Sequence, residues 1–449
     1  MRDIVILGII VISLPFCFRK PFFGVLMWEW IALFNPHRYA WSPTVYNFPV
    51  ALAVAVPTLL GLLSSRRFNR NLMTRETLLI LLLWIWMCIT LLAAAQVPLF
   101  EGHIPDGVDQ LVQITKILLM TFVTMLVVNS EDRLRKLVLV MAFSLGMRAL
   151  TDAFFGLRTG GEFRVYGAPD SFMADNNDFA LALNMILPLL YFAGVNEQNR
   201  WIRVALRLCF LAGVFSVILT YSRGGLLGLA TVLILIAAMS RYRILALALL
   251  GAVSMLVVSF APQAWTDRMD GMINGKVDSS AKQRLIAWQT GWNLVMDYPI
   301  TGGGLAAYPD VTVFRHYQPE PMPGGRESEG PHSIYFQVLG EQGFPGLALF
   351  ILLLGSCVFS MHKLRHQARR RARTHWATPY TQMFEVSLAA FVVSGAFLGR
   401  AYFDLWYEIA ACIIVVQLLY RQELRNERAE RELSEEHLDR EAELSAACS

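Results

Sequence analysis

The residues of this sequence best suited to chemistry are a few arginines and one histidine. Arg223 lies in Tyr221-Ser-Arg-Gly-Gly225, and the sequence places no acidic residue within a helical turn of it. The two glycines let a bulky ligand approach the backbone closely. Because paired guanidinium donors hold phosphate groups well, Arg223 is a candidate phosphate ligand. The alternative is an arginine whose charged end merely reaches the surface of a membrane.

A long polar segment between two apolar runs adds further candidates. Arg284 and Trp288 lie one helical turn apart in it, which suits a phosphosugar at a membrane surface. Gly302 to Gly304 form a glycine run after Pro299, and successive backbone amides in such a turn can form an anion-binding nest. A plain turn is the alternative interpretation of the glycine run.

His332, in Pro331-His-Ser333, lies where this polar segment meets the next apolar run. A histidine at such a boundary can titrate near neutrality and accept a proton. A histidine without a chemical role is the alternative. His362 and His366 share one face of a helix, but they lie in a basic segment, and we expect no metal there.

Several other enzyme classes are excluded by their motifs. The sequence lacks a Walker loop, an HExxH zinc motif, a Gly-x-Ser-x-Gly nucleophile and an Asp-x-Asp pair. The remaining arginines and histidine fit the transfer of a glycan from a lipid diphosphate, because that leaving group needs charge stabilisation and no general acid. One base then suffices for the acceptor hydroxyl, and we expect neither a metal nor a cofactor.

The elements that must position these residues are membrane helices. Of the 449 residues, 55% are apolar and 16% are charged, and the mean hydropathy is +0.46. Soluble domains have roughly 25% charged residues. Together with apolar runs near the length of about 20 residues that crosses a bilayer, this excludes an ordinary soluble enzyme. The net charge of +4 is too small to indicate a nucleic-acid partner.

We therefore predict an all-α, polytopic membrane protein with about 12 to 13 transmembrane helices. The apolar runs that would form them are residues 3–18, 21–34, 46–64, 77–95, 111–129, 137–156, 178–195, 204–221, 224–240, 243–261, 334–360, 382–398 and 403–420. The first two runs are short enough to form a hairpin.

Arginine and lysine are unevenly distributed between alternate loops. Basic residues concentrate in the segments 66–75, 133–136, 200–203, 241–243 and 363–373. The other short loops hold only Arg38, Arg158, Arg164 and Arg400. Because cytoplasmic loops retain basic residues, the first set is predicted to be cytoplasmic, which places the long polar loop in the periplasm of a bacterium.

Four segments follow from this topology. They are the N-terminal membrane helices (1–261), a periplasmic loop domain (262–331), the C-terminal membrane helices (332–420) and a charged cytoplasmic tail (421–449). Within the loop domain, the amphipathic stretch from Ala281 to Met296 predicts a helix on the membrane surface. The tail alternates acids and bases, as in Glu427 and Arg431, and predicts a solvated helix.

Some charged residues lie within or beside the apolar runs, where a charge costs at least about 2.5 kcal/mol. They are Lys116, Arg148, Asp152, Arg223, Glu341, Asp404 and Glu408. One polar cavity facing the periplasm would collect them. The alternative is local pairing of Arg148 with Asp152, and of Arg400 with Asp404, since each pair is four residues apart.

Taken together, these motifs resemble bacterial O-antigen ligases and the related O-antigen polymerases. His332-Ser333, followed by Gly343 and Gly346, is similar to their motif of His-[Asn/Ser/Gln], nine residues, Gly, two residues and [Gly/Thr/Tyr]. Ser222-Arg-Gly-Gly225 resembles the family's Ser-Arg-Gly segment. The series Arg284, Trp288, Pro299 and the glycine run resembles its Arg, Trp and Pro-x-x-Gly-x-Gly stretch.

Two further segments carry the resemblance. Arg164-Val-Tyr-Gly167 and Asn177 are similar to the opening of the ligase core, although the usual Asn-Pro-Asn is Asp175-Asn-Asn177 here. Asn35-Pro-His-Arg-Tyr-Ala-Trp41 resembles a subgroup of O-glycosylation ligases associated with exosortase A systems. The resemblance covers roughly residues 110–420.

The resemblance implies a GT-C type glycosyltransferase of the bacterial inner membrane with its active site facing the periplasm. It implies an undecaprenyl-diphosphate-linked glycan donor and metal-independent transfer with inversion. His332 would be the base, and Arg223 and Arg284 would grip the diphosphate. The expected substrate-binding residues are Arg164, Asn177, Trp288, Gly302, Gly304 and Ser333.

The acceptor stays open: it can be a lipid, a glycan or a protein. A polymerase of the same fold, which transfers the glycan to another lipid-linked glycan, is one alternative. A flippase, in which the charged residues line a substrate path, is another. Membrane lipids are the remaining expected partner.

Overall fold

The computed structural model describes residues 2–64, 72–240, 242–245, 247–248, 251 and 279–447, and these ranges contain helices and no β-strand. The α-helices are α1 (Arg2–Arg19), α2 (Pro21–Phe34), α3 (Pro43–Tyr46), α4 (Val50–Ser64), α5 (Arg75–Ala94), α6 (Ile104–Val127), α7 (Glu131–Arg158), α8 (Asn176–Asn196), α9 (Arg200–Leu219), α10 (Arg223–Met239), α13 (Ser279–Asp297), α14 (Val311–Tyr317), α15 (Ile334–Ala368), α16 (Ala377–Gly395) and α17 (Asp404–Ala447). Short 3-10 helices are η1 (Pro36–Tyr39), η2 (Pro98–His103) and η3 (Pro323–Gly325).

The chain is a polytopic membrane protein. Among the described residues, six helical segments are long and apolar enough to cross a membrane, and they are Arg75–Ala94, Pro98–Val127, Glu131–Arg158, Asn176–Asn196, Arg200–Leu219 and Ile334–Ala368. The helices α2, α4 and α10 are apolar but shorter.

The predicted count of about 12 to 13 spans is not confirmed. The predicted runs coincide with helices, but charged residues at the ends of α1 and in the first turns of α17 interrupt their apolar character. The run 243–261 falls largely outside the described residues. Length and composition therefore support fewer spans than the number of apolar runs.

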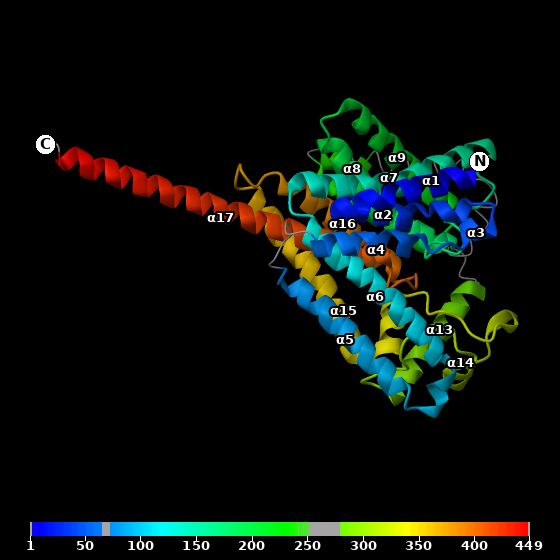
Figure 1. Cartoon of the computed structure of the whole chain (residues 1–449). Helices are drawn as coiled ribbons and strands as arrows, with labels where there is room; N and C mark the ends of the chain where they lie inside the picture. Colours follow the sequence, from blue (N-terminus) through cyan, green and yellow to red (C-terminus); the bar gives the residue numbers. More distant parts are fainter. Residues whose placement is uncertain are drawn as a thin grey trace.

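The core of the molecule lies around α8, which packs against α7, α9, α10 and α16. Most of its residues are buried. Figure 1 shows α5, α6 and α15 extending from this bundle towards α13 and α14, while α17 projects on the other side. α13 packs against α15, so it is held at the end where α15 begins.

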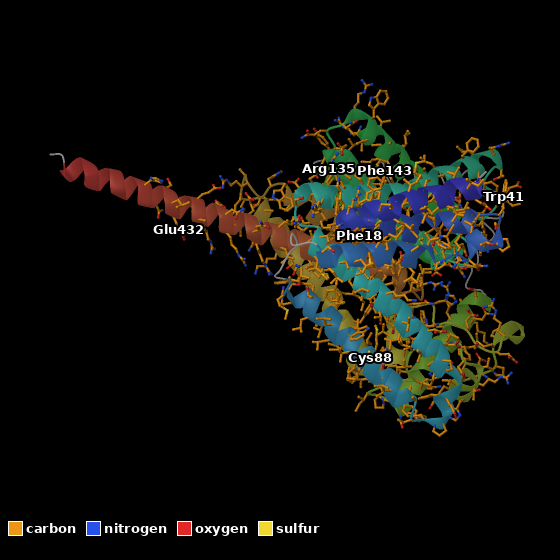
Figure 2. All side chains as sticks on the ribbon, in the orientation of Figure 1. Phe18, Trp41, Cys88, Arg135, Phe143 and Glu432 are labelled. Carbon is orange, nitrogen blue, oxygen red and sulfur yellow. The ribbon has the colours of Figure 1, made fainter. Side chains whose placement is uncertain are left out.

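Arg135 and Trp41 come from loops of the two predicted sets. Figure 2 shows Arg135, from a basic loop, and Trp41, from an arginine-poor loop, on opposite sides. Glu432 lies on the projecting part of α17, apart from the bundle. The tail is helical, as expected, and Arg431 pairs with Glu427 at 2.7 Å. The predicted amphipathic helix is also present as α13.

The charged residues in the apolar runs pair only partly as expected. Arg148 and Asp152 form an ion pair at 3.1 Å, which confirms local pairing on α7. The pairing of Arg400 with Asp404 is wrong, because Arg400 lies 2.7 Å from the carboxylate of Asp178 on α8. Asp404 accepts the backbone N–H of Leu405 instead. Contact between distant segments thus outweighs helical spacing at Arg400.

Candidate functional site

The Ser-Arg-Gly segment forms the first turn of α10, and Ser222 is its N-cap. The Ser222 hydroxyl accepts a hydrogen bond from the N–H of Gly225 at 3.0 Å, which satisfies one of the free donors of the helix end. It also donates to Asn177 Oδ1 at 2.7 Å. Arg223 is therefore the first helical residue, half-buried, with Asn177 bound to the residue before it.

Asn177 lies in the first turn of α8, which Asp175 caps. Asp175 Oδ1 accepts both the backbone N–H and the side-chain Nδ2 of Asn177 at 2.8 Å. Asn176 takes the place of the usual proline, and its buried Nδ2 donates to the carbonyl of Thr220 at 2.7 Å. The Asn176 side chain thus joins the start of α8 to the end of α9, two residues before Ser222.

Arg164 is exposed beside the same junction. Its guanidinium lies 5.8 Å from the centroid of the Tyr221 ring, within the range of a cation–π contact. The adjacent Val165 N–H donates to the carbonyl of Leu219 at 3.1 Å. The structure therefore brings together Arg164, Asn177 and the segment containing Arg223.

His332 lies just before α15 and contacts an acid that the sequence analysis did not single out. Its Nε2 is 2.8 Å from Glu329 Oε1, and Arg326 forms an ion pair with the same carboxylate. Burial raises the pKa of Glu329, but the bonds from His332 and Arg326 outweigh it and hold the pKa below its ordinary value. Glu329 could have been found from the sequence, because it lies only three residues before His332.

The contact defines what the imidazole can do. An ionised carboxylate only accepts, so in neutral His332 the Nε2 carries the proton and Nδ1 keeps a lone pair. The imidazole is half-exposed, with 34% of its side chain accessible, whereas Glu329 is only 12% exposed. His332 can accordingly accept a proton at Nδ1 while Glu329 stabilises the resulting cation.

The backbone of His332 has a φ of +43°, which is uncommon for a residue with a side chain. Trp288, on α13, donates from Nε1 to the carbonyl of Pro331 at 2.6 Å, and its ring stacks on Phe336 with centroids 5.1 Å apart. Arg284 lies one turn earlier on the same helix and is half-buried. α13 therefore links Arg284 to the segment that carries His332.

The loop from Phe397 to Arg400, between α16 and α17, lies between the two halves of the site. A Cβ atom on Gly224 would lie 3.2 Å from Phe397, and one on Gly399 would lie 3.2 Å from the backbone N of His332. Arg400 pairs with Asp178, next to Asn177. This loop brings the α8 and α10 ends close to His332, and its position was not predicted from the sequence.

Ser333 is the N-cap residue of α15 and is buried. Its carbonyl accepts the N–H of Gln337 at 2.8 Å. The side chain of Gln337 in turn accepts the N–H of Ala401 at 3.1 Å. These contacts give Ser333 a structural role in fixing the start of α15 against the neighbouring loop.

The glycine run is a turn whose amides are used within the protein. The N–H of Gly303 donates to the backbone carbonyl of Gly340 at 2.8 Å, and the N–H of Gly304 donates to the backbone carbonyl of Glu341 at 3.0 Å. Gly302 has a φ of +61°, and its N–H donates to Tyr298 at 2.8 Å. This arrangement favours the plain turn over the anion-binding nest.

The glycine run also explains the kink of α15. Gly343 has a φ of +66° inside the helix, and the next N–H, of Phe344, donates to the carbonyl of Pro299 at 2.9 Å. A Cβ atom on Gly302 would lie 2.5 Å from the carbonyl of Gly340. Gly302 and Gly343 thus allow the turn and the kinked helix to pack backbone against backbone, whereas a Cβ atom on Gly304 would lie 2.7 Å from the Cβ of Ala94 on α5.

No group of three or more acidic, histidine or cysteine side chains that could hold a metal ion occurs among the described residues. His362 lies 3.8 Å from Glu385, and Arg365 pairs with the same carboxylate at 2.5 Å. The His362–His366 segment is thus engaged in ion pairing and ring contact.

Two family models match overlapping segments within residues 1–351 of the chain. Residues 181–351 match the family model described as O-Antigen ligase. Residues 1–193 match a model described as a family of unknown function, DUF5935. No curated protein matches the chain. The segment that matches the O-antigen ligase model includes Arg223, Arg284 and His332 but begins after Arg164 and Asn177, and it is shorter than the range of about 110–420 expected from the motifs.

Proposed function

We propose that this protein transfers a glycan from undecaprenyl diphosphate to an acceptor hydroxyl on the periplasmic face of the bacterial inner membrane. The O-antigen ligase domain supports a lipid-linked glycan as the substrate. The observation that carries the proposal is the pair formed by His332 and Glu329, which lies beside the loop that also packs on the first turn of α10.

In the proposed reaction His332 Nδ1 accepts the proton of the acceptor hydroxyl. The oxygen attacks the anomeric carbon of the glycan, and the bond from that carbon to the diphosphate oxygen breaks. The diphosphate leaves with the electron pair, so a single displacement inverts the configuration. Glu329 stabilises the imidazolium that forms, as a carboxylate does in other histidine-based sites.

Arg223 and Arg284 are the proposed ligands of the diphosphate. Guanidinium groups stabilise the charge that develops on the leaving group, and no proton has to be supplied to it. The two arginines come from opposite sides of the site, one from the start of α10 and one from α13. The Phe397–Arg400 loop links the start of α10 to the His332 segment, and Trp288 links α13 to it.

The remaining expected residues divide into two groups by their contacts. Arg164 is exposed and Asn177 is half-exposed, and both lie beside the first turns of α8 and α10. They are proposed to bind the donor. For Trp288, Gly302, Gly304 and Ser333, the contacts favour positioning of His332 and of α15 over direct contact with substrate.

The acceptor is proposed to carry a hydroxyl group on a lipid, a glycan or a protein. The subgroup associated with exosortase A systems, suggested by the Asn35–Trp41 segment, favours O-glycosylation. That segment forms η1 and the start of the connection to α3, and Tyr39 in it accepts a hydrogen bond from Arg148 at 2.7 Å. The Asn35–Trp41 segment therefore lies against α7, and we propose that it forms part of the acceptor-binding side of the site.

The test is a reconstituted reaction with purified full-length protein in detergent, undecaprenyl-diphosphate glycan and candidate acceptors. We expect wild-type protein to form a glycosylated acceptor and free undecaprenyl diphosphate. His332→Ala should lose a factor of about 10² to 10⁴ in rate while donor binding persists. His316→Ala, an exposed histidine on α14, is the matched control and should behave as wild type.

Arg284→Ala should give a different defect, with donor binding and rate both reduced, because the diphosphate loses a ligand and its leaving-group stabilisation. A detergent solution has no compartments, so a flippase would form no product there. Near-normal turnover in His332→Ala would contradict the proposed base. The identity of the product separates a ligase from a polymerase.

A further inference from the structure

Lys116 is a charged residue inside a candidate membrane span that has no partner among the residues that the structure describes. Lys116 lies midway along α6, inside the candidate span Pro98–Val127. It forms no hydrogen bond or ion pair with any residue that the structure describes, although other ammonium groups do so. A cation at membrane depth is costly and is usually paired or functional. The proposed transfer reaction gives Lys116 no role.

Lys116 lines a cavity of about 410 Å³ between α2, α4 and α6. Arg38, from η1, is the second cation of this cavity, and no acidic side chain lines it among the described residues. Its walls are mainly apolar, with Leu52 and Leu59 of α4 and Leu119 of α6 among them. Two cations in an apolar pocket between membrane helices match an anionic head group that carries hydrocarbon chains.

His37, the third basic residue of the cavity, is neutral near pH 7. Burial lowers its pKa to about 4, and the charge of Arg38 contributes. The permanent positive charge of the cavity therefore comes from Arg38 and Lys116.

We infer that this cavity binds the phosphate-bearing head group of a lipid whose chains lie along α4 and α6. Two lipids share this chemistry: a polyisoprenyl diphosphate and an ordinary anionic phospholipid of the membrane. The cavity lies in residues 1–193, the part of the chain that matches a family of unknown function. It is a separate lipid site from the proposed diphosphate site at Arg223 and Arg284.

The rim of the cavity is joined to the candidate site. The Arg38 guanidinium lies 4.9 Å from the centroid of the Tyr46 ring. The Tyr46 hydroxyl donates to the carboxylate of Asp170. Asp170 lies in the loop that leads to Asp175, the cap of α8, and so to Asn177. A bound lipid would therefore lie beside the start of α8. Its binding would not require the transfer reaction.

The test measures lipid binding to the purified full-length protein in an uncharged detergent. The probes are undecaprenyl diphosphate, phosphatidylglycerol, diacylglycerol and inorganic pyrophosphate. We expect at least one phosphate-bearing lipid to bind more tightly than diacylglycerol, which lacks the charge, and than pyrophosphate, which lacks the chains. Lys116→Met, a neutral side chain of similar length, should weaken that binding about five- to tenfold.

Three further variants make the result specific. Lys116→Arg should retain binding, and Arg38→Gln should weaken it if Lys116→Met fails to fold. Arg158→Met is the matched control, because Arg158 contacts the exposed Phe154 ring on α7, away from the cavity, at 5.6 Å. It should leave lipid binding unchanged.

The preference between the two lipids identifies the source of the head group, and either preference supports the site. Equal binding of diacylglycerol, or unchanged binding in both Lys116→Met and Arg38→Gln, would overturn it. His332→Ala should leave this lipid binding intact. If the protein binds the lipid but transfers no glycan, the proposed function is wrong and the lipid site stands. If it transfers glycan but does not bind the lipid at this cavity, only the lipid site is wrong.

Discussion

The indole of Trp288 donates a hydrogen bond of 2.6 Å to the carbonyl of Pro331, the residue directly before His332. This bond joins α13 to the turn in which His332 adopts a φ of +43°. The ring also stacks almost parallel on Phe336, at an interplanar angle of 5°. α13 thereby holds the backbone of the proposed base from one side, while the loop at Gly399 packs against it from the other.

Trp288→Phe should test this positioning role. The phenyl ring can still stack on Phe336, but the donor to Pro331 is lost. Since a hydrogen bond of this kind contributes about 1 kcal/mol, we expect the transfer rate to fall by about fivefold to tenfold, with donor affinity preserved. Trp292→Phe is the control, because Trp292 makes an edge contact with Phe344 and is 46% exposed. Equal rates in both variants would remove Trp288 from the site.

Glu329→Gln should separate the charge of Glu329 from its shape. The amide can still occupy the place of the carboxylate, but it no longer stabilises a positive imidazole on His332. We expect the transfer rate to fall by about tenfold or more, with donor binding unchanged. The acid limb of the pH–rate profile should also shift to lower pH. Glu327→Gln, which disrupts an exposed pair with Arg315, should show neither effect. An unchanged profile in Glu329→Gln would contradict the pairing.

The lowered pKa of Glu329 predicts a pH dependence of stability. Burial opposes ionisation, but the bonds from His332 and Arg326 favour it and keep the folded-state pKa below the ordinary value. A depressed carboxyl pKa stabilises the fold above the unfolded-state pKa of about 4.3, and this contribution is lost as the pH falls through the folded-state value. The difference in melting temperature between wild type and Glu329→Gln should thus be constant from pH 5 to 7 and shrink below pH 4. A difference in melting temperature that grows as the pH falls would contradict this prediction.

Much of the fold could be predicted from the sequence, because burial in a membrane leaves a strong local signal. The apolar runs that fall on described residues coincide with helices, the amphipathic stretch forms α13, and Arg148 pairs with Asp152 across one helical turn. These features depend on residues close together in the chain. The span count is not confirmed, because several of the described helices are too short or have charged ends and do not satisfy the length and apolarity of a full span.

The candidate site was less predictable because its geometry depends on distant segments. Arg400 and Asp178 are 222 positions apart, so helical spacing could not suggest their pair. The glycine run was equally ambiguous, because an isolated turn and an anion nest have the same sequence. Only the carbonyls of the kinked α15 decide between them. Glu329, in contrast, lies three residues from His332 and could have been found.

Gly302→Ala should distinguish a structural turn from a ligand-binding nest. Its φ of +61° and a Cβ position 2.5 Å from the carbonyl of Gly340 both oppose a side chain. We expect a loss of about 2 to 4 kcal/mol in stability, seen as a lower melting temperature. Gly324→Ala has a similar φ of +79° but open space, so it should lose only about 1 kcal/mol. Wild-type stability with lost donor binding in Gly302→Ala would favour the nest.

Two changes compare how much the transfer rate depends on the candidate site and on the tail. They are Arg223→Lys and a truncation after Arg425. Lysine keeps the charge of Arg223 but loses the planar pair of donors at the start of α10, so we expect the transfer rate to fall at least tenfold while expression persists. Arg158→Lys is the control for a conservative change at an exposed arginine.

The truncation removes Glu427 and Glu430, which pair with Arg371 and Arg373 in the loop before α16. These pairs are largely exposed, and such pairs contribute little to stability. The truncated protein should therefore insert into membranes and transfer glycan at a rate within about twofold of the full chain. Transfer rates measured per inserted molecule compare the two changes. If the truncation abolished transfer while Arg223→Lys left it intact, the site would have to be sought near the tail and not at the α8 and α10 ends.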